Sequence, residues 1–492
     1  SRAALERSGG LAARLPLAHS LAWQGRGRDA DGVLAPVDPE YLSEWDLMAW
    51  TLPKAANQFW MLGESEQAIK FLADMRARIS EPAALHTIDA LDATFAMNAG
   101  EPPRAVTLAT QVLDSPAAQD LAVAWAAATA TLSCARMGRY ADVTPLARRG
   151  LAAQHPGLLR FVIGLGEITT LLMTGDVDSA EDTAKHYLEF AELQQPGHAI
   201  GEVLLAQVLM ARGDLGNAIS LLRQAAAALT DTGYSWGPLA LMCLAQALGQ
   251  RGNKTAAAAA LQRAEAAHGI KSELYAPELS LARAWTLAAA RDTHGALSAA
   301  RDAARIAARG GQATLTLRAL HDAVRLGDTH AVEPLTRVGL ECEFATMALA
   351  HARALAAGDG TALDEVSAVL AQAGMNGTAA DAAAQAAVAH AAGDNRKSEL
   401  KSKARAAELA RLCADASTPA LERVLNPLPL TGREREIAIM VADGLTNKAI
   451  AENLCVSIRT VEGHIYRACT KLDVSDRTML GHAVRAARGQ DG

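Results

Sequence analysis

The sequence is poor in cysteine and in aromatic residues, and neither sign of charge is in large excess. Its 492 residues include 19 aromatic residues and six cysteines, which lie 14 to 109 residues apart without a Cys-x-x-Cys pair. This spacing argues against a disulfide framework or a zinc site and favours a reducing cytoplasm. The 47 basic and 54 acidic residues exclude a uniformly basic surface, so any surface that binds nucleic acid must be local.

Long apolar runs and enzyme signatures are also missing. The uncharged stretch Leu121–Ala135 is too short to cross a bilayer, and Thr232–Gln250 is interrupted by glycine, proline and glutamine. The first ten residues contain no hydrophobic signal core. No HExxH, GxSxG or Cys–His signature occurs. We therefore expect a cytoplasmic protein that has no membrane segment, is not an enzyme, and holds no cofactor or metal in this chain.

A glycine-centred break recurs along most of the chain. It is found at positions 27, 63, 100, 138, 175, 213 and 252, at intervals of 36 to 39 residues, and weaker copies follow near 292, 327, 358 and 393. Apolar residues repeat every three to five positions on both sides of each break, as in amphipathic helices. A left-handed glycine can end the first helix, and a following Asp or Asn can cap the second. Each unit is thus predicted to be a helical hairpin.

One such hairpin cannot bury its apolar face alone, whereas a stack of them can, so the pattern predicts an α-solenoid. The spacing and the G-x-x-x-x-A turn resemble tetratricopeptide-like repeats over roughly residues 11–412, although most of that family's large consensus residues are absent. An irregular all-helical domain is the alternative. The turns are followed by alanines that would allow two helices to approach closely: Ala68, Ala105, Ala180, Ala218 and Ala296.

The repeat pattern ends before the last 80 residues. We assign residues 1–413 to the array and residues 414–428 to a linker, because prolines replace the apolar period there. The basic run Lys397–Arg411 precedes this linker. We interpret it as a solvated helix face, and contact with DNA is the alternative.

Residues 429–492 have the pattern of a compact helix-turn-helix. Thr431 and Glu434 form a capping box at the start of a first helix, which Gly444 ends. Thr446 then caps a short second helix, and Ser457 caps a third that runs to about Leu472. A short helix, a tight turn and a longer helix are the arrangement that places a recognition helix in the major groove of DNA.

The third helix divides into two faces. An apolar stripe faces inward and consists of Val461, Ile465, Ala468 and Leu472. The outer face provides charge, hydrogen-bonding groups and one position without a side chain, which suits close approach to a groove. That outer face consists of Arg459, Glu462, Gly463, Tyr466 and Arg467.

This region resembles the LuxR-type DNA-binding domain over about 60 residues. The matching positions are Leu430, Thr431, Arg433, Glu434, Gly444, Asn447, Lys448, Ile450, Ala451, Leu454, Val456, Ser457, Thr460, Val461, His464, Ile465, Lys471, Leu472, Val474 and Arg477. The resemblance implies a four-helix domain whose third helix enters the major groove of double-stranded DNA. It also implies that the fourth helix, Asp476–Ala487, forms a homodimer.

By the same resemblance, Asn447, Lys448 and Thr460 contact phosphates, whereas Glu462, Gly463 and Tyr466 meet bases. Two residues depart from the family pattern, because Glu462 stands where lysine is usual and Ala449 where glutamate is usual. The full set that we assign to DNA contact is Thr446, Asn447, Lys448, Ser457, Arg459, Thr460, Glu462, Gly463, Tyr466, Arg467 and Lys471.

The array and the terminal domain together resemble the C-terminal part of the large ATP-binding LuxR-family regulators. No GxxxxGK[ST] occurs and the chain does not begin with Met, so we expect the native gene to encode an ATPase upstream. The predicted function is sequence-specific transcriptional regulation, with an effector or protein partner sensed by the array. The alternative is an interaction scaffold with vestigial DNA binding.

A cluster of aromatic residues is the candidate effector site. Five of the 19 aromatic residues lie within twenty positions, and we assign effector contact to Trp45, Trp50 and Trp60. Packing between adjacent repeats is the alternative for these residues.

Overall fold

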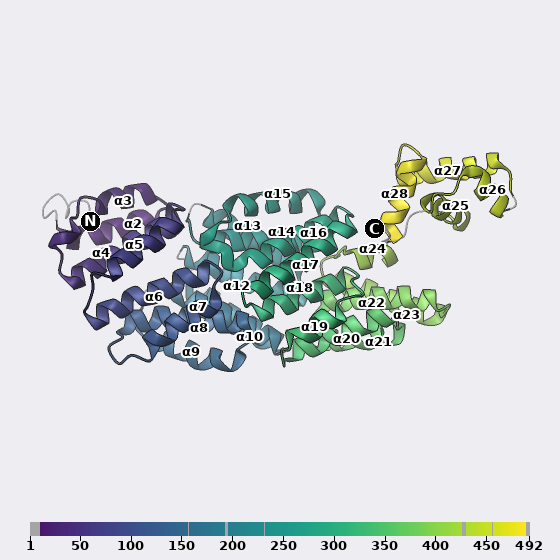
Figure 1. Ribbon diagram of the computed structural model, residues 1–492. Coiled ribbons are helices and arrows are strands. Elements are labelled where there is room, and N and C mark those ends of the chain that lie inside the picture. Colours follow the sequence, from purple (N-terminus) through teal and green to yellow (C-terminus); the bar gives the residue numbers. More distant parts are fainter. Residues whose placement is uncertain are drawn as a thin grey trace.

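The computed structural model describes residues 10–155, 157–191, 195–230, 232–425, 430–454 and 456–488. The described residues form helices and no strands, so the predicted all-α class is confirmed. Eleven hairpins stack into an elongated array, and a small four-helix unit lies beyond its end (Figure 1). Residues 1–9, 426–429, Cys455 and 489–492, which the predicted domains and linker included, lie outside the described residues.

The hairpins of the array are formed by helices α2 to α23. Their bounds are α2 Leu11–Trp23, α3 Gly27–Leu34, α4 Glu44–Ala56, α5 Ser65–Arg76, α6 Pro82–Asn98, α7 Pro102–Leu113, α8 Asp120–Met137, α9 Tyr140–Ala152, α10 Leu159–Met173, α11 Val177–Ala191, α12 Gly197–Arg212, α13 Leu215–Leu229, α14 Trp236–Gln250, α15 Lys254–Ala267, α16 Ala276–Ala289, α17 Thr293–Arg309, α18 Ala313–Arg325, α19 Val332–Val338, α20 Glu343–Ala357, α21 Gly360–Gln372, α22 Asn376–Ala392 and α23 Arg396–Leu412. Three shorter elements are η1 Pro39–Tyr41, the π-helical η2 Asn57–Met61 and η3 Ile270–Tyr275.

The predicted turns lie between the two helices of each hairpin. The six glycines from Gly63 to Gly252 in the repeat all have φ between +71° and +91°, the left-handed region that glycine occupies most easily. Three positions differ from the prediction. The first turn uses Gly25, because Gly27 already begins α3, and the turns near 292 and 393 use Arg291 and Asp394 as their left-handed residues.

The close approach predicted just after each turn is also found. All five recurring alanines have no exposed surface, as expected where two helix backbones come together. The predicted caps are present as well. The carboxylate of Asp214 accepts a hydrogen bond from the Asn217 amide at 3.2 Å, and Asn253 caps α15 in the same way.

The array coils so that hairpins five apart in sequence touch. Helix α8 contacts α18, α10 contacts α20, and α12 contacts α22. The Thr314 hydroxyl donates to the carbonyl of Ala135 at 2.7 Å across the first of these contacts. The glycine period did not predict this coiling, because it describes neighbouring repeats only.

Two of the turn glycines lie at these long-range contacts. A Cβ at Gly213 would be 2.6 Å from the Gly377 amide nitrogen and 2.6 Å from the Cys413 sulfur. A Cβ at Gly138 would overlap the side chain of Leu340. Glycine at these turns therefore serves both the positive φ and the contact between successive coils.

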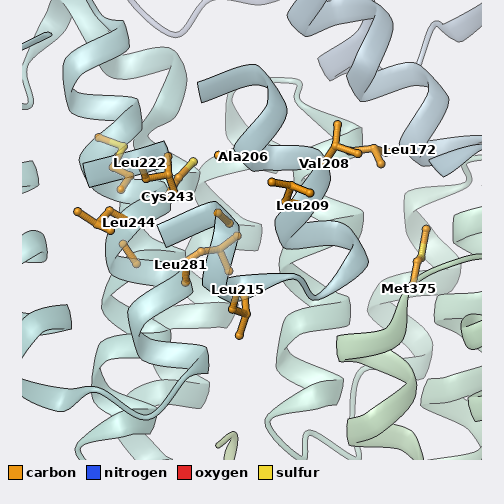
Figure 2. Close-up of a cluster of buried hydrophobic side chains, with 14 of the residues drawn as sticks. Leu172, Ala206, Val208, Leu209, Leu215, Leu222, Cys243, Leu244, Leu281 and Met375 are labelled. Carbon is orange, nitrogen blue, oxygen red and sulfur yellow. The ribbon is translucent and has the colours of Figure 1, made fainter. Parts of the chain in front are cut away.

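One apolar core runs through most of the array. It extends from Ala96 to Val424 and includes residues from each hairpin between these two positions. Figure 2 shows part of it, with Leu209 of α12, Leu244 of α14 and Leu281 of α16 among the members of this cluster. Met375, which precedes α22, belongs to the same cluster, so the core joins both coils.

Buried ion pairs join hairpins both between the coils and within one of them. Arg136 of α8 makes two hydrogen bonds to the Glu278 carboxylate, at 2.8 and 2.9 Å, and a third to Gln312 at 2.7 Å. Nearer the end of the array, Arg325 of α18 donates to Asp381 of α22 at 2.8 Å. Because these side chains are nearly inaccessible to water, each charge depends on its partner.

Part of the predicted linker is folded onto the array, which corrects that prediction. Helix α24, Pro419–Leu425, follows α23, and its Leu421 has only 1% of its surface exposed within the array core. The Ser417 amide donates to the carbonyl of Gln250 at 3.0 Å, and Thr418 hydrogen-bonds the Asp381 carboxylate. Pro419 is therefore the first residue of a short helix that docks on the array.

Candidate nucleic-acid interface

The C-terminal unit contains four helices, as predicted. They are α25 Gly432–Ala442, α26 Asn447–Leu454, α27 Ile458–Leu472 and α28 Arg477–Arg488. The predicted capping box is present, because Thr431 and Glu434 each bond the backbone of the other. Thr446 and Ser457 cap the next two helices by accepting from the amides of Ala449 and Thr460. Asp476 caps α28 by accepting from the Met479 amide at 2.9 Å.

The two predicted faces of α27 are found in the structure. Val461, Ile465 and Ala468 are buried in the core of this unit, and Leu472 packs against it. On the opposite face Tyr466 is 74% exposed, and Arg459, Glu462 and Arg467 are exposed as well. Ile458, which the sequence analysis did not select, adds a 45% exposed apolar side chain at the start of this face.

Glu434 of α25 pairs with two cations of α27, the predicted recognition helix. Its carboxylate accepts from Lys471 Nζ at 2.6 Å and lies 3.6 Å from Arg467 Nε, although Glu434 itself is only 3% exposed. The hydrogen bond from Lys471, together with the Thr431 amide, lowers the pKa of Glu434 to about 2. The sequence analysis predicted that Lys471 contacts DNA, but in the structure its ammonium group pairs with Glu434. Its contact with DNA would compete with this ion pair.

The start of α26 is braced by α28. Arg477 Nε donates to the Asn447 side-chain oxygen at 3.1 Å, and the same guanidinium also bonds the carbonyl of Leu445. Lys448, which follows Asn447, is exposed. This brace holds the two predicted phosphate contacts in a fixed place relative to α27.

Few cations on this surface are available to DNA. Within the described residues, Lys448 and Arg459 make no ion pair, whereas Arg467 hydrogen-bonds His464 at 3.0 Å. Glu462 adds a negative charge to this surface, and it makes no ion pair within the described residues. Gly463 has room for a Cβ, whose nearest neighbour would be Arg467 at 3.6 Å, so the fold of this unit does not itself require glycine there.

This geometry can be compared with known proteins. The family model described as "Bacterial regulatory proteins, luxR family" matches residues 428–484. Residues 428–484 are a LuxR-family regulatory domain.

The relatives that match do so over short stretches of the chain. The chain is 54% identical over 56 residues to the transcriptional regulatory protein LiaR of Bacillus subtilis, covering 11% of this chain and 26% of that protein. It is 43% identical over 49 residues to the response regulator protein VraR of Staphylococcus aureus, covering 10% and 23%. The chain therefore spans about a quarter of the length of the curated relatives it matches.

A solved structure resembles the array in front of the LuxR-type domain. The crystal structure of a Rap protein complexed with competence and sporulation factor has a TM-score of 0.50 and 15% identity, covering 68% of this chain and 99% of that chain. At this identity the likeness concerns the fold alone. It agrees with the predicted α-solenoid of tetratricopeptide-like hairpins.

The three tryptophans assigned to an effector do not form one pocket. Trp50 is buried and its ring nitrogen donates to the Leu34 carbonyl at 3.1 Å, while Trp45 is 43% exposed. Trp60 packs edge-on against Phe95, with 5.3 Å between ring centroids, and Phe59 stacks on the same ring. Packing between repeats, the alternative interpretation, accounts for Trp50, Phe59 and Trp60.

In the described residues, no group of three or more His, Cys, Asp or Glu side chains is placed to hold a metal ion, and the five described cysteines are free thiols. None of the described helices combines the length and apolar character needed to cross a bilayer.

Proposed function

We propose that this chain is a sequence-specific DNA-binding transcriptional regulator that works in the cytoplasm and is not an enzyme. The observation that carries the proposal is the LuxR-type recognition helix, whose exposed face presents Arg459, Glu462 and Tyr466 while its opposite face is buried. Arginine and an acidic side chain at a major-groove surface can read guanine and cytosine edges respectively. In this proposal residues 429–492 bind DNA as a homodimer through α28, and no cofactor takes part.

The array is proposed to receive the signal. A groove of about 490 Å³ lies between α20 and α21, with Met347, Val366 and Val369 among its apolar lining residues. Apolar hollows with a few charged groups suit small effectors or peptide side chains. This groove replaces the three tryptophans as the place where we would look for an effector.

A second function, an interaction scaffold with weak DNA binding, is favoured by the charges around α27. Lys471 is paired with Glu434, and Glu462 would repel phosphate, so few cations remain to attract DNA. The two functions predict different results with the intact chain.

The test is selection of bound sequences from a random duplex pool, followed by genome-wide mapping of sites bound by the intact protein. One enriched motif that recurs at the mapped sites is expected. The matched control replaces the exposed Arg459 and Tyr466 with alanine, which leaves the core untouched and should abolish enrichment. If the unaltered protein enriches no motif and instead co-purifies with a protein partner, the scaffold function replaces the regulatory one.

A further inference from the structure

We propose that the outer face of α23, the last hairpin helix of the array, is a second DNA-binding surface that contacts phosphates flanking the site read by α27. The inference rests on the proposed function, because it needs a DNA molecule held by the LuxR-type domain. It adds a part of the array to the DNA interface, in a place that the family match does not cover.

Helix α23 differs in charge from the chain that carries it. It contains six basic residues and two acidic ones, whereas the whole chain has a net charge of −7. Both acids are paired locally, Glu399 with Arg396 at 2.7 Å and Glu408 with Arg405 at 3.3 Å. The remaining cations of the helix therefore have no acid to neutralise them on their own element.

Three of those cations form one exposed face. Lys397, Lys401 and Arg411 are exposed, and within the described residues none of them makes an ion pair. Their helical spacing places them on one side of α23, which they share with Glu408, the partner of Arg405. The opposite side is the one that packs against the array, through Ser402, Ala406, Leu409 and Ala410.

The position of α23 explains why this face is uncovered. No twelfth hairpin follows α23, and α24 and α22 contact it from the array side. The helix lies at the end of the array nearest to the LuxR-type domain in sequence (Figure 1). A terminal repeat needs a polar outer face for solubility, but that need is met by mixed charges and does not require an excess of cations.

The short connection to the LuxR-type domain favours DNA as the partner. Helix α24 ends at Leu425 and the domain core begins at Leu430, so five peptide steps join them and span at most about 18 Å. One turn of B-DNA is about 34 Å long, so a duplex that extends two turns or more beyond the site read by α27 is long enough to reach the array end. Evenly spaced phosphates also match a row of unpaired cations without any need for base contacts.

The experiment measures the salt dependence of binding by the full chain. The DNA carries the motif selected by the unaltered protein, either in a short duplex that ends at the motif or with 20 base pairs of flanking DNA on each side. The variant replaces Lys397, Lys401 and Arg411 with glutamine, which keeps helix propensity nearly constant. The matched control makes the same change at Lys70, Arg223 and Arg309, which are exposed and unpaired on other helices.

On the long duplex, we expect the slope of log K against log salt to fall in magnitude by about 0.9 for each lost phosphate contact, hence by two to three for the α23 variant. The control variant should keep the slope, and the two proteins should behave alike on the short duplex. The selected motif should not change, because this face reads no bases.

Equal slopes for the unaltered protein and the α23 variant on the long duplex would overturn the inference while leaving the proposed function intact. So would a change of oligomeric state in the variant, or binding to anionic vesicles that the variant loses, because the face would then serve a second copy or a membrane. Failure of the unaltered protein to select any motif would instead remove the proposed function on which the inference rests.

Discussion

At the scale of single residues, the side chain of Glu462 is the main reason to expect an unusual operator. It is exposed on the face of α27 that is free of the core, and a carboxylate there accepts a hydrogen bond from a cytosine amino group. Glu462→Lys should therefore change the preferred bases, with each good contact worth about 1–3 kcal/mol. Lys448→Ala should weaken binding to all sequences about equally and flatten the salt slope by about one.

Selection from a random pool, run for both variants, separates these effects. The face assigned to DNA is wrong if Glu462→Lys leaves the motif unchanged while Lys448→Ala alters it.

Glu434 makes the stability of the LuxR-type domain depend on pH. Its pKa is about 2 in the folded protein and about 4.3 in an unfolded chain, so the carboxylate stabilises the fold at pH above about 5. This contribution is lost as the pH falls from about 5 towards 2. Hydrogen exchange of α25 and α27 should show faster opening in Glu434→Gln than in the unaltered protein at pH 6, and the difference should shrink at pH 3. A difference that is constant between these pH values would contradict the role given to Lys471.

At the scale of elements, the turn glycines are not equivalent. Gly63 has φ of +71° and open space around its Cα, whereas Gly213 has φ of +91° and faces the backbone of Gly377. Gly63→Ala should cost about 1–2 kcal/mol, the price of a left-handed alanine. Gly213→Ala should cost about 1–3 kcal/mol more, because the two coils must move apart. Urea unfolding followed by tryptophan fluorescence checks this order, and equal losses would mean that the coils do not depend on this contact.

Features with a local signal could be predicted from the sequence. The turn glycines follow from their recurrence every 36 to 39 residues, and the buried alanines beside them and the two faces of α27 follow from residues one or two helical turns apart. These predictions are confirmed, with the first turn shifted to Gly25. The coiling has no such local signal, because Gly213 and Gly377 are far apart in the sequence and approach each other only in the folded array. Lys471 and Glu434 are 37 positions apart, so the ion pair that occupies a predicted DNA contact was equally hidden. The fold of α24 was missed because Pro419 and the two prolines that follow the helix in sequence resemble those of a linker.

At the scale of the whole molecule, the pair Arg325–Asp381 ties α18 to α22 and, through Thr418, to the segment before α24. Asp381→Ala leaves a buried guanidinium with fewer partners, and the free energy of unfolding should fall by about 3–5 kcal/mol. Replacing Arg325 with Met and Asp381 with Leu together removes both charges and should recover most of this loss. Chemical unfolding of both variants and of the unaltered protein provides the measurement. A double variant as unstable as Asp381→Ala would show that shape, and not charge, holds this junction.

The contacts between hairpins five apart also change how the array should fold. In an open repeat protein each unit touches only its neighbours, so stability is a one-dimensional sum and the ends fray independently. Here α8, α10 and α12 rest on α18, α20 and α22, which makes the first half of the chain a structural partner of the second. The array should therefore melt as one cooperative unit, and it should fold slowly, because distant segments must meet before their contacts form. Deletion of the last three hairpins would remove α18, α20 and α22. Helices α8, α10 and α12 would then lose the partners that they pack against in the other coil.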